Sequence, residues 1–284
     1  MVKIIADSTC DLSEELIRRY DIAILPLHIL MGDQEYEDGR EITPEEIYRW
    51  SDQNKTTPKT SAPSMEHAIE LFRPYLEGNQ EIVCFSISQE MSTSGNVMRL
   101  AAQELEASER VFVVDSASLS TGIGLLVLEA AQLAAQGMQA GEIAKRMEKR
   151  KQQVRASFVV DTLTYLYRGG RCSGLAAMAG GVLKLHPRIA VENGKMLPGK
   201  KYRGRISAVI LDYVKDMEES LKQADAKRVF ITHSGCSKEQ VAAVRSYLES
   251  LNHFSEILET RAGGVISSHC GPGTLGVLFL TDEV

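Results

Sequence analysis

The sequence contains no apolar run that approaches the roughly 18 residues needed to span a bilayer, and it has no excess of basic residues. Its 32 lysines and arginines are outnumbered by 38 aspartates and glutamates, which leaves a formal net charge of −6. This balance argues against nucleic acid or an anionic membrane surface as a partner, because both need a basic face. The N-terminal segment Met1–Asp7 reaches an acidic residue too soon for a signal peptide. We therefore expect a soluble, cytoplasmic protein without stable membrane insertion.

Cysteine is sparse, since the five residues are widely spaced, odd in number and form no Cys-x-x-Cys pair. That pattern is typical of reduced thiols in a reducing cytosol. A metal site built from His233-x-x-Cys236 and His269-Cys270 is an alternative, but its two dispersed pairs depart from the usual spacing of zinc ligands. We expect neither a metal nor a cofactor.

The first half of the chain alternates strand-like and helical segments, which is typical of βαβ units around a parallel sheet. Helices are expected after the capping residues Ser13 and Thr43. The other expected elements are strands at Val2–Ala6, Ile22–Leu30, Glu81–Ile87 and Arg110–Asp115, and helices at Ser94–Ala107, Thr121–Ala135 and Ala140–Gln153. Because 284 residues exceed the usual size of one core, we expect two domains, the first a Rossmann-like parallel α/β domain at 1–156.

The pattern changes after about residue 157, where helices no longer alternate regularly with strands. The pair Asn193-Gly194 is the turn signal of a tight hairpin. Strands are expected at Phe158–Val160, Arg188–Val191, Arg228–Thr232 and Val277–Leu280, and helices at Arg205–Gln223 and Lys238–Ser250. We therefore expect a C-terminal α+β domain at 157–284 with a partly antiparallel sheet, and a ligand between the two domains. Apolar residues at helical spacing in Leu175–Leu185 (Met178, Val182, Leu183 and Leu185) belong either to the core or to the wall of a ligand tunnel.

Hydroxyl side chains cluster where several predicted strands end. The clusters are Asp7-Ser8-Thr9, Thr60-Ser61-Ala62-Pro63-Ser64, Ser86–Gly95 and Asp115-Ser116. Ligands of parallel sheets bind at the carboxyl ends of the strands, and the helices that begin there present free N–H groups to anions. Ordinary helix capping explains any one of these clusters, but a helix cap needs only one hydroxyl group. The set therefore favours a polar floor that binds an oxyanion.

Six short motifs of small, hydroxyl-bearing and basic residues follow one another along the whole chain. They are Asp7-Ser8-Thr9, Thr60-Ser61-Ala62-Pro63-Ser64, Ile87…Met91-Ser92…Asn96, Val114-Asp115-Ser116…Ser120-x-Gly122-x-Gly124, Leu166-Tyr167-Arg168-Gly169-Gly170-Arg171 and His269-x-Gly271-Pro272-Gly273. In this order and number they resemble the DegV family. The resemblance implies a parallel-sheet domain, a second α/β domain and a long-chain fatty acid buried between them.

The resemblance also implies roles for single residues. Thr60, Ser61 and Ser92 would bind the fatty-acid carboxylate. Arg171 and His269 would support that site and the transfer of a phosphoryl group to the carboxylate, which a separate ATP-dependent fatty acid kinase subunit performs. Arg168 is the alternative to Arg171, because the motif offers two arginines. On this interpretation the chain is a lipid carrier and no enzyme by itself.

This sequence departs from the family pattern near the expected head-group site. Ala62 stands where the family usually has Gln, and Thr93-Ser94 replaces Gly-Thr. Gln89-Glu90 replaces a small neutral pair, and an inward Glu90 would repel a carboxylate. We therefore expect Glu90 to face solvent.

Two further hypotheses concern activity and partners. A serine hydrolase acting on an acyl substrate is the alternative function, with Ser92, His269 and Asp115 as its triad, although no Gly-x-Ser-x-Gly motif is present. Walker A is absent, so we expect no ATP binding by the chain alone. Arg203 and Arg205, in a basic cluster, are either a solvated face or a docking patch for the kinase.

Overall fold

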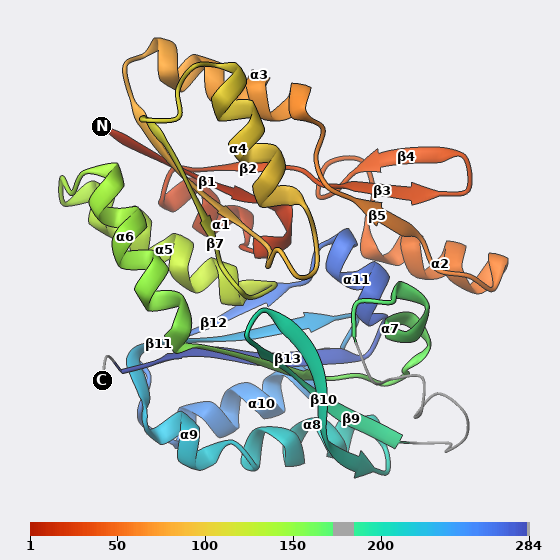
Figure 1. The fold of residues 1–284 in the computed structure, drawn as a ribbon. Helices are drawn as coiled ribbons and strands as arrows, with labels where there is room; N and C mark the ends of the chain where they lie inside the picture. Colours follow the sequence, from red (N-terminus) through yellow and green to blue (C-terminus); the bar gives the residue numbers. More distant parts are fainter. Residues whose placement is uncertain (173–184, 283–284) are drawn as a thin grey trace.

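The computed structural model describes residues 1–172 and 185–282, and three β-sheets organise them (Figure 1). Met178, Val182 and Leu183, expected in the core or the tunnel wall, lie outside the described residues. Leu185 is the first residue of a strand, β9 (Leu185–Glu192).

The first sheet is parallel throughout, with strand order β2-β1-β6-β7. Its strands are β1 (Val2–Asp7), β2 (Ile22–Leu25), β6 (Glu81–Ser86) and β7 (Val111–Asp115). One face packs against α3 (Met65–Glu77) and α4 (Ser94–Glu104). The other face packs against α1 (Glu14–Arg19), α5 (Thr121–Ala135) and α6 (Ala140–Arg150). The prediction of a Rossmann-like parallel sheet is therefore confirmed.

The second sheet is mixed, with strand order β10-β9-β8-β13-β11-β12. Its pairs are antiparallel except β11 with β12. Besides β9, its strands are β8 (Val154–Val159), β10 (Lys195–Arg203), β11 (Ala224–Ser234), β12 (Glu256–Arg261) and β13 (Thr274–Thr281). The helices on its outer face are α8 (Ile206–Lys215), α9 (Glu218–Lys222) and α10 (Lys238–Ser250). A partly antiparallel second sheet was expected, and the structure confirms it.

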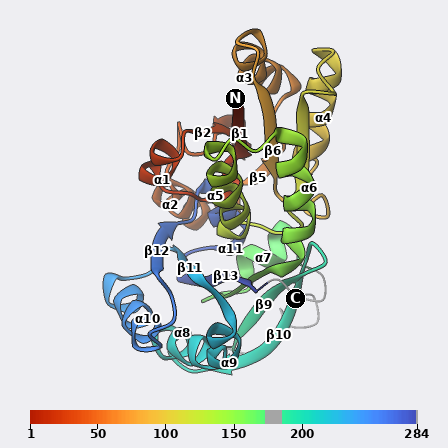
Figure 2. The same ribbon diagram turned by 90° about the vertical axis from the view of Figure 1, so that its left-hand side faces the viewer.

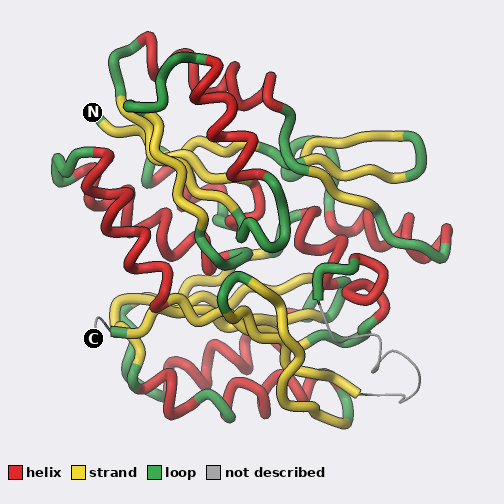
Figure 3. The backbone as a smooth tube through the Cα atoms, in the orientation of Figure 1, coloured by secondary structure: helices red, strands yellow, loops and turns green. Residues whose placement is uncertain are grey.

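Helix α5 lies between the two sheets, as the view turned by 90° shows (Figure 2). Its residues are buried around the whole helix, apart from Glu129, Gln132, Ala134 and Ala135 toward its C-terminal end. A helix that is apolar on all sides needs such a position between two layers. The molecule is therefore layered, with helices outside and between two sheets (Figure 3).

A third, small sheet lies beside these layers, with order β4-β3-β5. Its strands are β3 (His28–Met31), β4 (Gln34–Glu37) and β5 (Lys59–Ser61). It packs against α2 (Pro44–Asn54) and α11 (Gly264–Cys270) in an apolar cluster that joins Ile29, Ile47 and Val265. The remaining elements are α7 (Thr164–Gly169), η1 (Ser8–Cys10) and η2 (Lys151–Gln153). This cluster places α11, from the end of the chain, against the first half.

Two expected elements are each divided in the structure. The run Ile22–Leu30 forms β2 and β3 in different sheets, because Pro26 between them cannot donate to a ladder. The helix expected at Arg205–Gln223 stops at Lys215 and restarts at Glu218. Asp216, in the gap, accepts hydrogen bonds from Lys200 and Tyr202.

The division expected between residues 156 and 157 falls inside β8 and stays a prediction. The two halves share one apolar cluster, in which α5 meets β8 and β13. No helix of the described residues is long and apolar enough to cross a membrane.

Candidate functional site

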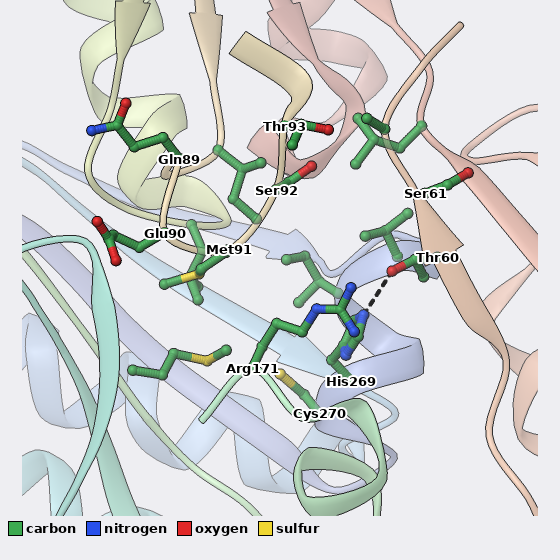
Figure 4. Close-up of a pocket in the computed structure, with 17 residues that line it drawn as sticks. Thr60, Ser61, Gln89, Glu90, Met91, Ser92, Thr93, Arg171, His269 and Cys270 are labelled. Carbon is green, nitrogen blue, oxygen red and sulfur yellow. Dashed lines mark hydrogen bonds between the residues drawn. The ribbon is translucent and has the colours of Figure 1, made fainter. Parts of the chain in front are cut away.

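A cavity of about 430 Å³ lies where the carboxyl ends of β6 and β7 meet α11 and the segment after α7. Thr60, Ser61, Ser92, Arg171 and His269, the five residues expected to bind and support a ligand head group, all line it (Figure 4). They come from β5, from the loop between β6 and α4, from the segment after α7 and from α11. The fold thus brings residues that are up to 209 positions apart into one wall.

Thr60 and His269 are in direct contact across this wall. Thr60 Oγ1 lies 2.8 Å from His269 Nε2. Thr60 and Ser61 leave β5 on opposite sides, and Figure 4 shows the Ser61 hydroxyl directed away from His269. Thr60 therefore points its hydroxyl group at the imidazole, while Ser61 borders the cavity.

The imidazole of His269 is held in its neutral form. Burial, with the nearby charge of Arg171 as a smaller cause, lowers the pKa of His269 to about 4. Its Nδ1 is enclosed and has no hydrogen-bond partner among the described residues. A Cβ atom at Gly169 would lie 2.3 Å from that nitrogen, which explains why glycine suits this position.

The structure distinguishes the two candidate arginines. Arg171 lines the cavity, and its Nη1 donates to the Gly169 carbonyl at 2.7 Å. Arg168 lies exposed in the last turn of α7 and does not line the cavity. Gly170 adopts φ +67° after the helix, a turn that favours glycine and redirects the chain toward the cavity.

Ser92 lies in the tight loop that leads into α4. Its Oγ accepts from the Ser94 N–H at 3.3 Å, and its own N–H donates to the Ser88 carbonyl. The hydroxyl hydrogen of Ser92 is therefore left to donate to another group. Figure 4 shows the Ser92 and Thr93 hydroxyls on the side of the cavity that faces β5.

Glu90 is exposed and directed away from Thr60 and His269, as the sequence predicted (Figure 4). Its Oε2 lies 3.2 Å from Lys195 Nζ. Gly194 precedes Lys195 in the hairpin between β9 and β10, and its carbonyl accepts a hydrogen bond from Ser88 Oγ at 2.8 Å. These two contacts join the second half of the chain to the Ser92 loop.

Apart from Gln89, Glu90 and Thr93, the rest of the cavity wall is apolar. The apolar residues are Leu27, Ala62, Ile87, Met91, Leu119, Met196, Val265, Ile266 and Cys270. Sequence reasoning missed Leu27, Leu119, Met196, Val265 and Ile266, because an apolar residue by itself does not distinguish a cavity wall from the core. A correct sheet register was the signal that could have identified Met196, which lies two residues after the Asn193-Gly194 turn.

Arg203 and Arg205 lie outside the cavity. Both side chains are exposed and make no hydrogen bond or ion pair among the described residues. Arg203 ends β10, seven positions beyond the cavity residue Met196, so their Cα atoms are separated by about 20 Å along the strand. A docking role for this pair stays a prediction.

The geometry does not support the hydrolase alternative. His269 Nε2 contacts Thr60, and no described carboxylate orients its Nδ1. The Asp115 carboxylate instead accepts from the N–H groups of Gln89 and Ala117. Within the described part of the chain, Ser92, His269 and Asp115 do not form a triad. Among the described residues, no group of three or more His, Cys, Asp or Glu side chains is placed to hold a metal ion.

Comparison with known proteins gives a consistent picture. The model of the DegV family, described as uncharacterised proteins, matches residues 1–282. A DegV domain-containing protein of Deinococcus radiodurans is 33% identical over 97% of both chains. A fatty-acid-binding DegV family protein of Thermus thermophilus superposes with a TM-score of 0.90, at 30% identity and 99% coverage of both chains.

A stearic-acid-binding protein of Eubacterium ventriosum has the same fold, with a TM-score of 0.85 and 29% identity. The match covers 99% of this chain and 98% of that one. Family model, relatives and solved structures agree over almost the full length. The chain therefore belongs to the DegV family.

Proposed function

We propose that the chain binds one long-chain fatty acid in the cavity and presents its carboxylate to a separate kinase. The observation that carries this proposal is the convergence of Thr60, Ser92, Arg171 and His269 on one wall of a mainly apolar cavity. A fatty acid has the matching composition, one anionic end and a long apolar chain. The relatives from Thermus thermophilus and Eubacterium ventriosum, which bind fatty acids, support the same assignment.

The tautomer of His269 prepares Thr60 for a carboxylate. A buried N–H without an acceptor is rarer in proteins than an acceptor without a donor. The proton therefore belongs on Nε2, because Nδ1 has no partner among the described residues. Nε2 then donates to Thr60 Oγ1, and the Thr60 hydroxyl hydrogen is free to donate to the ligand.

Glu90 also lines the cavity, but its carboxylate is paired with Lys195 at 3.2 Å, so the charge of the head-group wall itself suits an anionic ligand. His269 is neutral near pH 7 because its pKa is about 4, so Arg171 supplies the single positive charge at this wall. A guanidinium and two hydroxyls satisfy a carboxylate that would otherwise be costly to bury. Ser61 borders the site.

The apolar part of the cavity supplies the remaining affinity. Each buried methylene contributes about 0.8 kcal/mol, so a chain of about 15 methylenes offsets the entropic cost of binding. The volume of about 430 Å³ falls in the usual range for small-molecule sites.

The proposed partner is an ATP-dependent fatty acid kinase subunit. The sequence has no Walker A motif, so nucleotide and metal would come from the partner. Arg171 and His269 would stabilise the carboxylate oxygen that accepts the phosphoryl group. Arg203 and Arg205 would guide docking of an acidic face, since both are exposed and unpaired among the described residues. The five free thiols support a cytoplasmic location.

Palmitate binding by Thr60→Ala and Ser92→Ala tests the head-group assignment. Each variant removes a hydrogen bond to a charged acceptor, so each should weaken binding by roughly 1.5–3 kcal/mol. Thr57→Ala is the matched control, because Thr57 lies three residues before Thr60 and outside the cavity. Wild-type affinity in both Thr60→Ala and Ser92→Ala would place the carboxylate elsewhere.

A further inference from the structure

Three buried aspartates of the first half lie behind the head-group wall. Asp7, Asp11 and Asp38 are 0%, 4% and 2% exposed. Burial is the main cause that raises the pKa of each carboxyl group. Buried carboxylates are costly unless their oxygens are well bonded, so their partners indicate why they are there.

Asp38 bonds the beginning of α11. Its Oδ1 accepts from the N–H groups of Gly264 at 2.7 Å and Val265 at 3.3 Å. Its Oδ2 accepts from Ser8 Oγ at 2.7 Å, and Ser8 Oγ in turn accepts from the Leu27 N–H. Asp38 therefore joins η1, the segment before β3 and α11 through one carboxylate.

Asp11 bonds the residue just before the same helix. Its Oδ1 accepts from the Gly263 N–H at 2.8 Å, and its Oδ2 accepts from Ser120 Oγ at 2.5 Å. A Cβ atom at Gly264 would lie 2.5 Å from Ile29 Cδ1 and 3.0 Å from Asp38 Oδ1. The backbone at the start of α11 therefore approaches the first half closely at a point where a side chain does not fit.

Asp7 bonds the loop that forms the opposite wall of the cavity. Its Oδ2 accepts from the Ile87 N–H at 2.9 Å and from Ser94 Oγ at 2.8 Å. Ile87 and Ser94 are the two ends of the loop that carries Ser92. Asp7 thus holds the Ser92 loop, whereas Asp11 and Asp38 hold the helix that carries His269.

We propose that Asp11 and Asp38 are positioning residues that place His269 against Thr60, and that Asp7 places Ser92 on the opposite wall. His269 lies five residues after Gly264 in α11, about 7.5 Å along the helix axis. A shift at the start of α11 is therefore carried to the imidazole, while Thr60 stays on β5 with the first half. The role of the site as a fatty-acid head-group site rests on the function proposed above.

The titration of His269 in the ligand-free full chain tests this proposal directly. The six histidines give a simple ring spectrum by NMR, and His269→Gln assigns the relevant signal. In Asp38→Asn the imidazole pKa should rise from about 4 toward its ordinary 6.5, because a displaced α11 admits water. Removal of a negative charge by itself lowers an imidazole pKa, so a rise reports displacement.

Asp225→Asn is the matched control for loss of a structural carboxylate. Asp225 Oδ2 contacts Nη2 of the buried Arg150 at 2.5 Å, at a place that does not touch α11. Asp225→Asn should lower the melting temperature and leave the His269 titration unchanged. If Asp38→Asn behaves in the same way, its role is merely structural and the proposal is overturned.

A milder variant and a second readout cover the case in which Asp38→Asn does not fold. Ser8→Ala removes the hydrogen bond to Asp38 Oδ2 without changing any charge, and should raise the His269 pKa in the same direction. An unchanged pKa in Ser8→Ala would then overturn the proposal.

Palmitate binding supplies the second readout. Asp38→Asn should reduce palmitate affinity about tenfold. This reduction should be smaller in the Thr60→Ala background, because Asp38 and Thr60 act through the same contact with His269. Equal losses in both backgrounds contradict the positioning role. If the wild type does not bind palmitate at all, the proposed function fails, while the titration still decides the positioning role.

Discussion

The neutral imidazole of His269 makes stability depend on pH. In the folded chain it takes a proton near pH 4, and in the unfolded chain near its ordinary 6.5. Between these values the unfolded state binds more protons, so this contribution to stability falls as pH drops from 6.5 to 4 and is constant below. The fall is on the order of 3 kcal/mol.

Urea denaturation of wild type and His269→Gln from pH 7 to pH 4 isolates this contribution. Asp7, Asp11 and Asp38 act in the opposite direction, because their raised pKa values favour the folded state as pH falls. Both chains contain those aspartates, so their effect cancels in the difference. The advantage of wild type over His269→Gln should shrink toward pH 4, and a constant difference would show that the imidazole is not held neutral.

Motif resemblance predicted the polar residues of the site and little of its apolar wall. Thr60, Ser92 and His269 stand in recognisable motifs, and all line the cavity. The choice between Arg168 and Arg171 needed the backbone turn at Gly170, which a sequence pattern does not specify. Contacts such as that of Asp38 with Gly264 join residues 226 positions apart, beyond the reach of local patterns.

Local sequence signals predicted the helices and turns that contacts between neighbouring residues stabilise. The capping residues Ser13 and Thr43, the helix α10 and the Asn193-Gly194 hairpin are all present in the structure. The short helices α7 and α11 were missed, since helices of this length depend on tertiary contacts. For α11 those contacts are the carboxylates of Asp11 and Asp38. The longer helix α3 and the strand β12 were not predicted either.

The tip of the hairpin between β9 and β10 should be sensitive to a single added methyl group. Gly194 has φ +78°, and a Cβ atom there would lie 2.5 Å from Ser88 Oγ. Gly194→Ala should therefore cost backbone strain and also a clash with the Ser92 loop, together about 2–4 kcal/mol. Urea denaturation measures this loss.

Gly32→Ala is the control for strain alone. Gly32 lies in the turn between β3 and β4 with φ +65°, and nothing lies within 4 Å of its Cβ position. Gly32→Ala should lower the free energy of unfolding by only about 1–2 kcal/mol. Equal losses in the two variants would mean that Ser88 does not hold the hairpin.

At the scale of the whole molecule, neither half of the chain contains the site alone. Thr60 and Ser92 come from the first half, and Arg171, Met196 and His269 from the second. The proposed kinase should therefore recognise both halves, with Arg203 and Arg205 as its electrostatic guide.

Charge reversal tests that guide. Arg203→Glu with Arg205→Glu should reduce kinase-dependent acyl phosphate formation severalfold and leave palmitate binding unchanged, because both side chains are exposed and outside the cavity. The control reverses two adjacent exposed arginines of α1, Arg18→Glu with Arg19→Glu. Equal turnover in both double variants would remove the docking role and leave fatty-acid binding intact.

Mass spectrometry of an organic extract from the purified full chain measures fatty-acid binding in the cavity without any added ligand. A pre-formed apolar cavity with a satisfied head-group wall should retain its ligand through purification. We expect about one fatty acid per chain, of about 14–18 carbons. An extract without fatty acid, from a protein that also fails to take up added palmitate, would show that the cavity does not bind fatty acids.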